Sequence, residues 1–232
     1  MNLFIQETSE LVESTVPLVE EETQTVFDII LSGDPSGTVI IGILILLLFV
    51  ALYIYFERLF KIKGSSKIDD KFMLQIKDHV SNGRIDAAKI LCAQENSPVA
   101  RLTEKGISRI GSPLEDINGG AIENAGKLEV YKLEKNVSIL ATIAGAAPMI
   151  GFLGTVIGMV IAFRTLAESD GAPEMGTLAE GIYTAMTTTV AGLIVGIIAY
   201  IGYNHLVVKT DKVVHQMESN AVDFLDLLNE PA

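Results

Sequence analysis

The sequence predicts an all-α membrane protein with three transmembrane helices, of which the second and third extend into a cytoplasmic helical bundle. The first observation is that no Asp, Glu, Lys or Arg occurs in residues 35–56, 136–163 or 181–208. Each of these blocks exceeds the ~20 residues that a helix needs to cross about 30 Å of hydrocarbon. The second is that helical spacing of apolar residues continues outside the second and third blocks, in segments that carry charge.

The N-terminal segment, residues 1–36, contains eight acidic residues and no Lys or Arg. It therefore lacks the basic start of a secretion signal. Two interpretations stay open for it: an exposed, partly helical lead-in, or an amphipathic helix on the outer surface of the membrane. The turn-rich stretch SGDPSG then leads into the first transmembrane helix, expected at 37–57.

The distribution of basic residues predicts the orientation in the membrane. Of the 17 Lys and Arg residues, 14 lie in 58–137, two follow the third span, and only Arg164 lies between the second and third spans. Cytoplasmic segments of membrane proteins carry the excess of Lys and Arg. We therefore expect 58–137 and the C-terminal helix 207–232 in the cytoplasm, with 1–36 and the loop 164–180 outside.

The cytoplasmic segment is expected to be helical, with short helices near residues 68–80, 84–94 and 98–110. Ser97 followed by Pro98 is typical of a helix N-terminus. A second start, Ser112-Pro113-Leu114-Glu115, matches a capping box. Because no strong breaker follows it before Pro148, one helix is predicted to run from residue 113 through the second span to about residue 165. The segment also holds Cys92, which as the only cysteine can form no intrachain disulfide.

The second span, expected at 138–163, carries a stripe of small residues on one helical face. Its members are Ala144, Pro148, Gly151, Thr155, Gly158 and Ala162. Gly154 and Gly158 also form a GxxxG pattern. Small residues let helix backbones approach closely in a membrane, so helix packing is the simplest interpretation of the glycines. Pro148 removes a backbone hydrogen bond and can kink the helix. The same packing role is expected for Gly192 and Gly196 on the third span.

The third span, expected at 181–206, begins with a cluster of threonines. Around the helix axis, the residues within about 60° of Thr184 are Glu180, Thr187, Thr188 and Ala191, while Thr189 lies about 140° away. A lone threonine in a membrane helix usually bonds back to its own helix. A cluster beneath an acid, with Thr155 on a neighbouring helix, instead predicts a polar site, because polar groups at membrane depth tend to face a cavity or a partner.

These motifs resemble the MotA/TolQ/ExbB proton-channel family and, within it, the ExbB/TolQ branch. The first span closes with Glu57-Arg58, and the second contains the block ATIAGAAPMIGFLGTVIGMVIAF. The third span carries the pattern GI-x-x-A-M-x-T-T-x-A-G-L from Gly181 to Leu193 and ends with Tyr203-Asn204. The resemblance covers residues 25–215.

The resemblance implies a multi-pass subunit of an inner-membrane motor, with its N-terminus in the periplasm and its C-terminus in the cytoplasm. Members of the family form pentamers around the transmembrane helices of an ExbD- or TolR-like dimer, and a TonB-like protein is a further candidate partner. Proton flow energises outer-membrane transport or related envelope work. Protons pass an aspartate of the partner, next to family threonines that match Thr155 and Thr189. An ion pathway lined by Thr155, Thr184, Thr188 and Thr189, with Glu180 at its outer end, is therefore expected.

One position departs from the family pattern. The ExbB/TolQ branch usually has a glutamate five residues before the threonine that matches Thr189, and this chain has Thr184 there. Either Glu180, one turn further out, replaces that glutamate, or the hydroxyls and the partner's aspartate suffice. We favour the second interpretation. A pathway lined by hydroxyls is also compatible with Na⁺.

Other function classes fit less well. A passive membrane scaffold would need the small-residue stripes and no hydroxyls. A stand-alone transporter would be expected to show internal repeats or broken helices, and neither is evident. The three histidines have no acid or nucleophile grouped with them, so no enzyme, metal site or cofactor is expected. The net charge of −12 gives no electrostatic basis for binding nucleic acid.

Overall fold

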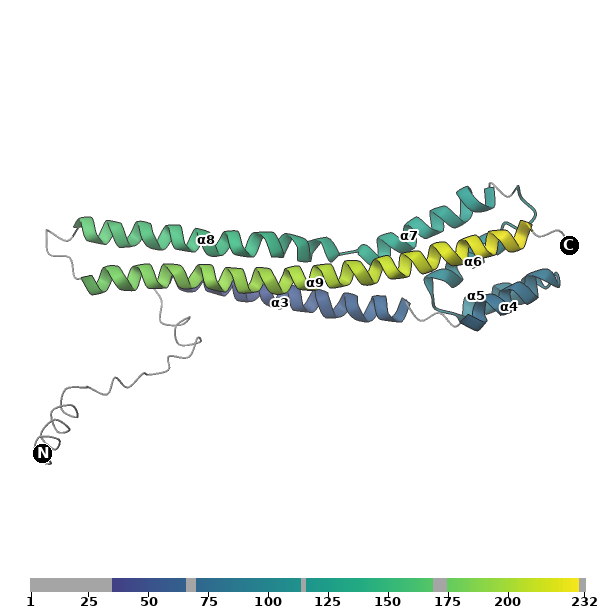
Figure 1. Cartoon of the computed structure of the whole chain (residues 1–232), viewed down its shortest axis with the longest axis horizontal. Helices are drawn as coiled ribbons and strands as arrows, with labels where there is room; N and C mark the ends of the chain where they lie inside the picture. The colour runs from purple at the N-terminus through teal and green to yellow at the C-terminus, as the bar shows by residue number, and fades with distance from the viewer. Residues whose placement is uncertain (1–34, 66–69, 114–115, 169–174, 230–232) are drawn as a thin grey trace, which may run out of the picture.

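The computed structural model describes residues 35–65, 70–113, 116–168 and 175–229, and every regular element in these ranges is a helix (Figure 1). In chain order the elements are α3 (Pro35–Ser65), α4 (Asp70–Ser81), α5 (Ile85–Gln94), α6 (Pro98–Ile107), the short π-helix η1 (Asp116–Ile122), α7 (Glu123–Glu134), α8 (Val137–Glu168) and α9 (Met175–Asn229). Residues 1–34, for which an amphipathic helix is one of two interpretations, lie outside the described residues, as do the capping-box residues Leu114 and Glu115 and the central part of the loop 164–180.

Three of these helices are long and apolar enough to cross a membrane, which confirms the prediction of an all-α membrane protein with three transmembrane helices. They belong to α3, α8 and α9, which run side by side along the molecule (Figure 1). At 1.5 Å per residue, the 55 residues of α9 reach about 80 Å, far more than the ~30 Å of a hydrocarbon core. The remainder of α9 passes alongside α6 and α7 at the other end of the molecule (Figure 1).

The membrane part of the molecule is a bundle in which α3 packs against both α8 and α9. Its buried core comprises Ile40, Leu44 and Ala51 of α3, Ile143 and Ala147 of α8, and Val195 and Ala199 of α9. Large apolar side chains cover the outside of the same helices, among them Phe49, Phe152 and Ile201. Exposed apolar surface on all sides of a bundle is what a lipid solvent permits and water does not.

A second core lies where α4 to α7 gather around the C-terminal part of α9. We call these short helices, together with the C-terminal part of α9, the extramembrane bundle. Leu206, Val213, Met217 and Phe224 of α9 are buried against the short helices. The observed bounds of α4, α5 and α6 agree with the three short helices expected from apolar spacing. Ser97 caps α6 as expected, because its side-chain oxygen accepts a hydrogen bond from the amide of Ala100 at 3.1 Å.

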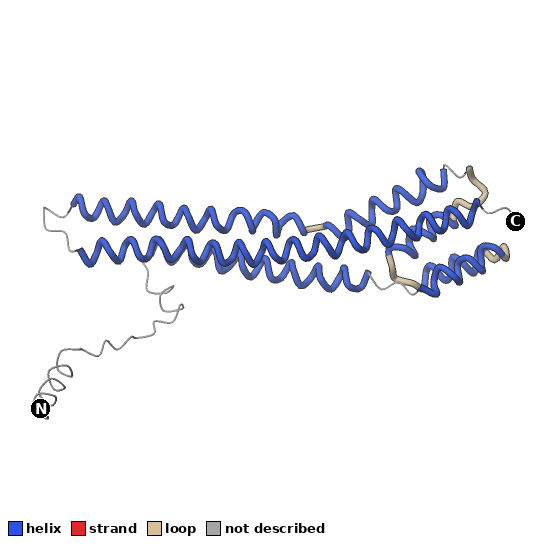
Figure 2. The backbone as a smooth tube through the Cα atoms, viewed as in Figure 1, coloured by secondary structure: helices blue, strands red, loops and turns tan. Residues whose placement is uncertain are grey.

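The expected single helix from residue 113 to 165 is wrong, because the chain leaves the helical path between α7 and α8. Asn136 has a φ of 64°, in the left-handed region, and Lys135 before it is not helical. Figure 2 shows the short loop that results. A carbonyl near the end of α7 no longer finds a helical N–H. Arg58 of α3 supplies a replacement, since its guanidinium donates to the carbonyl of Lys132 at 3.3 Å.

Candidate functional site between α8 and α9

The closest approach of two membrane helices is made by glycines. A Cβ atom added to Gly192 of α9 would lie 2.6 Å from the carbonyl oxygen of Ala147 and 2.9 Å from the Cα of Gly151, both in α8. A Cβ added to Gly151 would lie 2.7 Å from the carbonyl oxygen of Thr188. These are backbone atoms, which cannot move aside as a flexible side chain does. Only glycine therefore fits at both positions.

The other small residues singled out in the sequence also lie in this contact. A Cβ atom added to Gly154 would lie 2.8 Å from the Cβ of Thr188. One added to Gly158 would lie 2.7 Å from the Cβ of Ala185. Further along, Gly196 of α9 lies under the ring of Pro148, whose Cγ is 2.6 Å from an added Cβ. The small-residue stripe of α8 is thus covered by α9 of the same chain.

A cluster of hydrogen-bonded hydroxyls crosses this contact. Thr155 of α8 is hydrogen-bonded to Thr189 of α9 through their side-chain oxygens, and it also lies 3.2 Å from the carbonyl oxygen of Ala185. Thr189 lies 3.1 Å from the carbonyl oxygen of Gly151. Thr188 lies 3.1 Å from that same oxygen and 2.7 Å from the carbonyl oxygen of Ala185. We call these three hydroxyls and two carbonyls the hydroxyl network.

The members of the hydroxyl network differ in their access to the surroundings. Thr188 is 1% exposed, because its side chain lies against Gly154 of α8 and near Gly37 of α3. Thr155 and Thr189 are half-buried. A group approaching the α8–α9 contact can therefore reach the Thr155–Thr189 pair, but it cannot reach Thr188.

The remaining polar residues of the predicted pathway lie elsewhere. Thr184 is turned towards α3, where its methyl group is 3.1 Å from the position of a Cβ on Gly37. The Thr187 hydroxyl donates to the carbonyl of Tyr183 in its own helix at 3.0 Å. Glu180 is exposed, and no contact in the described part of the chain joins it to the hydroxyl network. The structure therefore brings together Thr155, Thr188 and Thr189, and leaves Thr184 and Glu180 apart from them.

Sequence reasoning did not identify the two backbone carbonyls of the hydroxyl network. Periodicity places Thr188 on the face of Thr184 and away from Thr189, yet Thr188 and Thr189 both reach the carbonyl of Gly151. They can do so because Gly151 has no side chain to hold α9 at a distance. The signal in the sequence was the glycine four residues before Thr155, which exposes a carbonyl to a neighbouring helix.

A second polar feature joins the membrane bundle to the extramembrane bundle. Glu129 of α7 accepts hydrogen bonds from Arg101 of α6 at 2.6 Å and from Lys132 at 2.7 Å. Burial alone would raise the pKa of Glu129, but these two cations outweigh it and hold that pKa below its usual range. Arg58, 3% exposed, continues the contact to α3 through the carbonyl of Lys132. Sequence reasoning missed the Arg101–Glu129 and Arg58–Lys132 contacts, since each joins residues of different helices.

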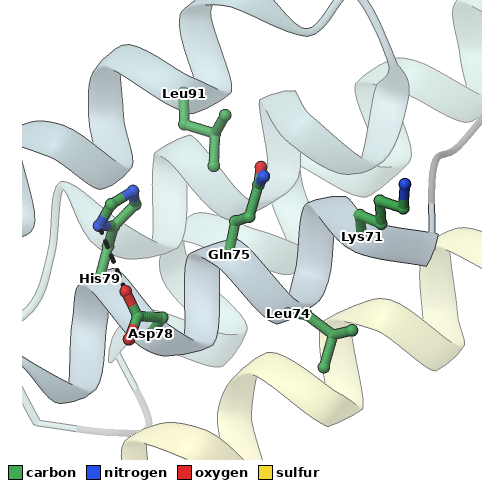
Figure 3. A pocket seen from close by; sticks show the side chains of 6 residues that line it. All are labelled: Lys71, Leu74, Gln75, Asp78, His79 and Leu91. Carbon is green, nitrogen blue, oxygen red and sulfur yellow. Dashed lines mark ion pairs between the residues drawn. The ribbon is translucent and has the colours of Figure 1, made fainter.

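A hollow of about 600 Å³ lies on the extramembrane bundle, between α4 and α5. It is lined by Lys71, Leu74, Gln75, Asp78, His79 and Leu91 (Figure 3). Asp78, which approaches His79 at 4.0 Å, is bound more closely by Arg84 at 2.6 Å. No residue of the predicted pathway lines the hollow. Within the described ranges, no three His, Cys, Asp or Glu side chains are grouped as metal ligands would be.

Comparison with known proteins supplies independent findings. The model of the MotA/TolQ/ExbB proton channel family matches residues 94–219, a range that includes the whole hydroxyl network. The chain is similar to a putative biopolymer transport protein ExbB homolog of Methanothermobacter thermautotrophicus, with 31% identity over 139 residues. It is also similar to the Tol-Pal system protein TolQ of Pseudomonas aeruginosa, with 34% identity over 101 residues, and to the biopolymer transport protein ExbB of Aquifex aeolicus, with 40% identity over 78 residues.

These similarities extend over part of each protein. The alignments cover 59%, 44% and 34% of this chain, in the same order, and 47%, 43% and 52% of the three relatives. The chain thus spans about half the length of the curated relatives it matches.

Proposed function

Because the chain belongs to the MotA/TolQ/ExbB proton channel family, in which its relatives are ExbB and TolQ proteins, we propose that it is the ion-conducting subunit of an ExbB/TolQ-like motor. In this proposal the proton motive force across the inner membrane drives protons past the Thr155–Thr189 pair. An ExbD/TolR-like dimer converts that flow into movement, which energises outer-membrane transport or related envelope work. A TonB-like protein is a further candidate partner.

The hydroxyl network is the observation that carries this proposal. It lies in the uncharged parts of two membrane helices, where polar groups are costly and tend to serve a function. A hydroxyl both donates and accepts a hydrogen bond, so it can solvate water or a neutral acid without adding a fixed charge. A neutral lining in turn lets an aspartate of the partner change its protonation state as it moves between wet and dry surroundings.

The pathway has to form between molecules. The core of the membrane bundle is filled by apolar side chains, so the described helices of one chain enclose no channel. We therefore propose a homo-oligomer, a pentamer by analogy with the family, in which the α8–α9 contacts of the copies surround the partner's transmembrane helices. The N-terminus and the loop 164–180 are placed in the periplasm, and the extramembrane bundle is placed in the cytoplasm, where the excess of Lys and Arg belongs.

A passive membrane scaffold is the second candidate, and one observation favours it. The small residues of α8 are occupied by α9 of the same chain, so they explain how the bundle is held together without invoking an ion path. A sodium-driven motor is a variant of the first proposal, because hydroxyl and carbonyl oxygens are also ligands for Na⁺. The two candidates and the variant differ in what they require of the hydroxyls.

The test replaces hydroxyls without changing shape. The chain is purified from its native membranes with whatever remains bound and is reconstituted in liposomes. Proton uptake driven by a potassium diffusion potential is then followed with a pH-sensitive dye. Thr155→Val is expected to lower the flux by roughly tenfold or more, the factor that corresponds to about 1.4 kcal/mol. Thr187→Val is the matched control, since the Thr187 hydroxyl serves only its own helix and its loss should leave the flux unchanged.

Each outcome separates the candidates. If Glu180→Gln abolishes flux while Thr155→Val does not, the acid near the start of α9 is the ion-binding group. If the flux depends on a sodium gradient and not on a proton gradient, the motor is sodium-driven. A parent chain that purifies alone and carries no flux would leave the scaffold as the remaining candidate.

A further inference from the structure

The hydroxyl network contains more hydrogen-bond donors than its backbone acceptors can take. Each of the three hydroxyls has one hydrogen to donate. The carbonyls of Gly151 and Ala185 have two lone pairs each, and one of these already accepts the N–H four residues further along the same helix. The two carbonyls therefore offer one free lone pair each to three hydroxyl hydrogens.

Thr188 always occupies one of these two places. It is 1% exposed, and its hydroxyl contacts only the carbonyls of Gly151 and Ala185, so it has no water or other acceptor to turn to. One carbonyl place is then left for Thr155 and Thr189 together. One of those two hydroxyls takes that place, and the other has to donate to its neighbour's oxygen.

Two arrangements of hydrogens satisfy every member of the network. In the first, Thr188 donates to Ala185, Thr189 donates to Gly151, and Thr155 donates to the oxygen of Thr189. In the second, each hydroxyl donates to a different acceptor: Thr188 donates to the carbonyl of Gly151, Thr155 donates to the carbonyl of Ala185, and Thr189 donates to the oxygen of Thr155. The Thr155–Thr189 hydrogen bond is present in both.

Without the Thr188 hydroxyl, two hydroxyl hydrogens remain for the two free carbonyl lone pairs. Thr155 and Thr189 can then each donate to a carbonyl, and nothing obliges either of them to donate to the other. If both do so, their two oxygens face each other with lone pairs only, a repulsive arrangement that the side chains or the helices relieve by separating.

We propose that Thr188 is a positioning residue for the ion path: by occupying one backbone carbonyl, its sealed hydroxyl enforces the Thr155–Thr189 hydrogen bond that joins α8 to α9. This inference rests on the proposed function, in which the Thr155–Thr189 pair is the part of the network that ions meet. In both arrangements the three hydrogens are used internally, so the pair offers only lone pairs to an arriving group. The pair therefore holds a hydrogen-bond donor, such as water or a protonated carboxyl group, in preference to a carboxylate.

The test is a double-mutant cycle in the liposome assay described above. Thr188→Val removes the hydroxyl and keeps the shape, and we expect it to lower the proton flux by roughly tenfold. Thr188→Ser retains the hydroxyl and should restore most of the flux. Thr155→Val combined with Thr188→Val should be no worse than Thr155→Val alone, because without the pair Thr188 has nothing to position. The thermal midpoints of all variants are measured to show that the chain still folds.

The outcomes distinguish this inference from the function on which it rests. If Thr155→Val loses flux but Thr188→Val does not, the ion path stands and the role of Thr188 is overturned. Separate, multiplying losses in the double variant would also overturn it, since Thr188 would then act on packing alone. If neither Thr155→Val nor Thr188→Val changes the flux, the proposed ion path past the Thr155–Thr189 pair itself fails.

Discussion

At the scale of single residues, the shape of the membrane bundle depends on where side chains are missing. The backbones of α8 and α9 come together at Gly151 and Gly192, and the same approach brings the carbonyl of Gly151 within reach of two threonine hydroxyls from α9. Packing and chemistry are therefore not separable here. A residue that pushed the helices apart would also break the hydroxyl network.

This link gives a prediction for Gly192. Gly192→Ala places a methyl group 2.6 Å from the carbonyl oxygen of Ala147, and we expect the overpacking to cost about 1–3 kcal/mol. Gly145→Ala is the matched control on α8, because an added Cβ there meets nothing within 4 Å. Alanine favours helix more than glycine does, so this variant should be as stable as the parent or slightly more stable. Thermal unfolding in detergent measures both, and equal midpoints for the two variants would contradict the close contact.

Glu129 gives a prediction about pH. Its pKa is lowered in the folded protein by Arg101 and Lys132. Its contribution to stability is therefore fully present above the pKa of a glutamate in the unfolded chain, about 4.3, and is lost as the pH falls through the lower pKa of Glu129 in the folded protein. We expect the parent to be more stable than Glu129→Gln at neutral pH, with the difference shrinking below about pH 4. The thermal unfolding midpoints of both proteins, measured from neutral pH down to below about pH 4, provide the measurement. A difference that stayed constant down to acidic pH would show that the carboxylate is not stabilised by its partners.

At the scale of elements, much of the architecture follows from the sequence. A helix that crosses lipid has to be apolar over its whole length, so the three uncharged blocks predict the three long helices without reference to anything they touch. The Ser97-Pro98 start of α6 is likewise local, since the capping side chain of Ser97 and the amide of Ala100 that donates to it lie within three residues. Features determined by one element are the ones that the sequence predicts.

The rest depends on how elements meet. Periodicity describes each helix around its own axis, but it cannot give the rotation of α9 against α8, which decides that Thr188 faces Gly151 while Thr184 faces Gly37. The break at Asn136 is similar, because asparagine is tolerated within a helix and in the left-handed region alike. The break is accompanied by a contact from another element, since Arg58 of α3 donates to the carbonyl of Lys132 near the end of α7.

The break yields a prediction for Asn136. With φ at 64°, Asn136→Gly should preserve or slightly improve stability, because glycine adopts this conformation without steric cost. Asn136→Ala should lose about 1–2 kcal/mol, the cost of the left-handed region for a residue with a Cβ and no polar side chain. Chemical or thermal unfolding of the full chain compares the two. If alanine proved the better residue, α7 and α8 would form one continuous helix, as the sequence alone suggested.

At the scale of the whole molecule, the distribution of basic residues agrees with the arrangement of the helices. Segment 58–137 carries 14 of the 17 Lys and Arg residues, and its short helices α4 to α7 all lie at one end, alongside the C-terminal half of α9 (Figure 1). The far end, where α8 ends and α9 begins, has only Arg164, which is paired with Glu168 at 2.8 Å. A single orientation across the membrane therefore places 16 of the 17 basic residues on one side.

The native cysteine is not a suitable reporter of that orientation. Cys92 is 2% exposed within α5, and burial, together with the nearby Glu104, raises the pKa of its thiol to about 12. A thiol reacts through its thiolate, so Cys92 should resist labelling on either side of the membrane. For the same reason it need not be removed, and single cysteines can be added to the otherwise unchanged chain.

Two such cysteines test the orientation. Ser169→Cys lies between the second and third spans, and Ser219→Cys lies on the exposed surface of the extramembrane part of α9. In intact spheroplasts, a membrane-impermeant maleimide should label the first and leave the second unlabelled until the membrane is permeabilised, because the excess of Lys and Arg predicts that the extramembrane bundle lies in the cytoplasm. The parent chain, with only Cys92, should stay unlabelled in both conditions. Labelling of position 219 before permeabilisation, with position 169 protected, would invert the orientation and place the extramembrane bundle in the periplasm.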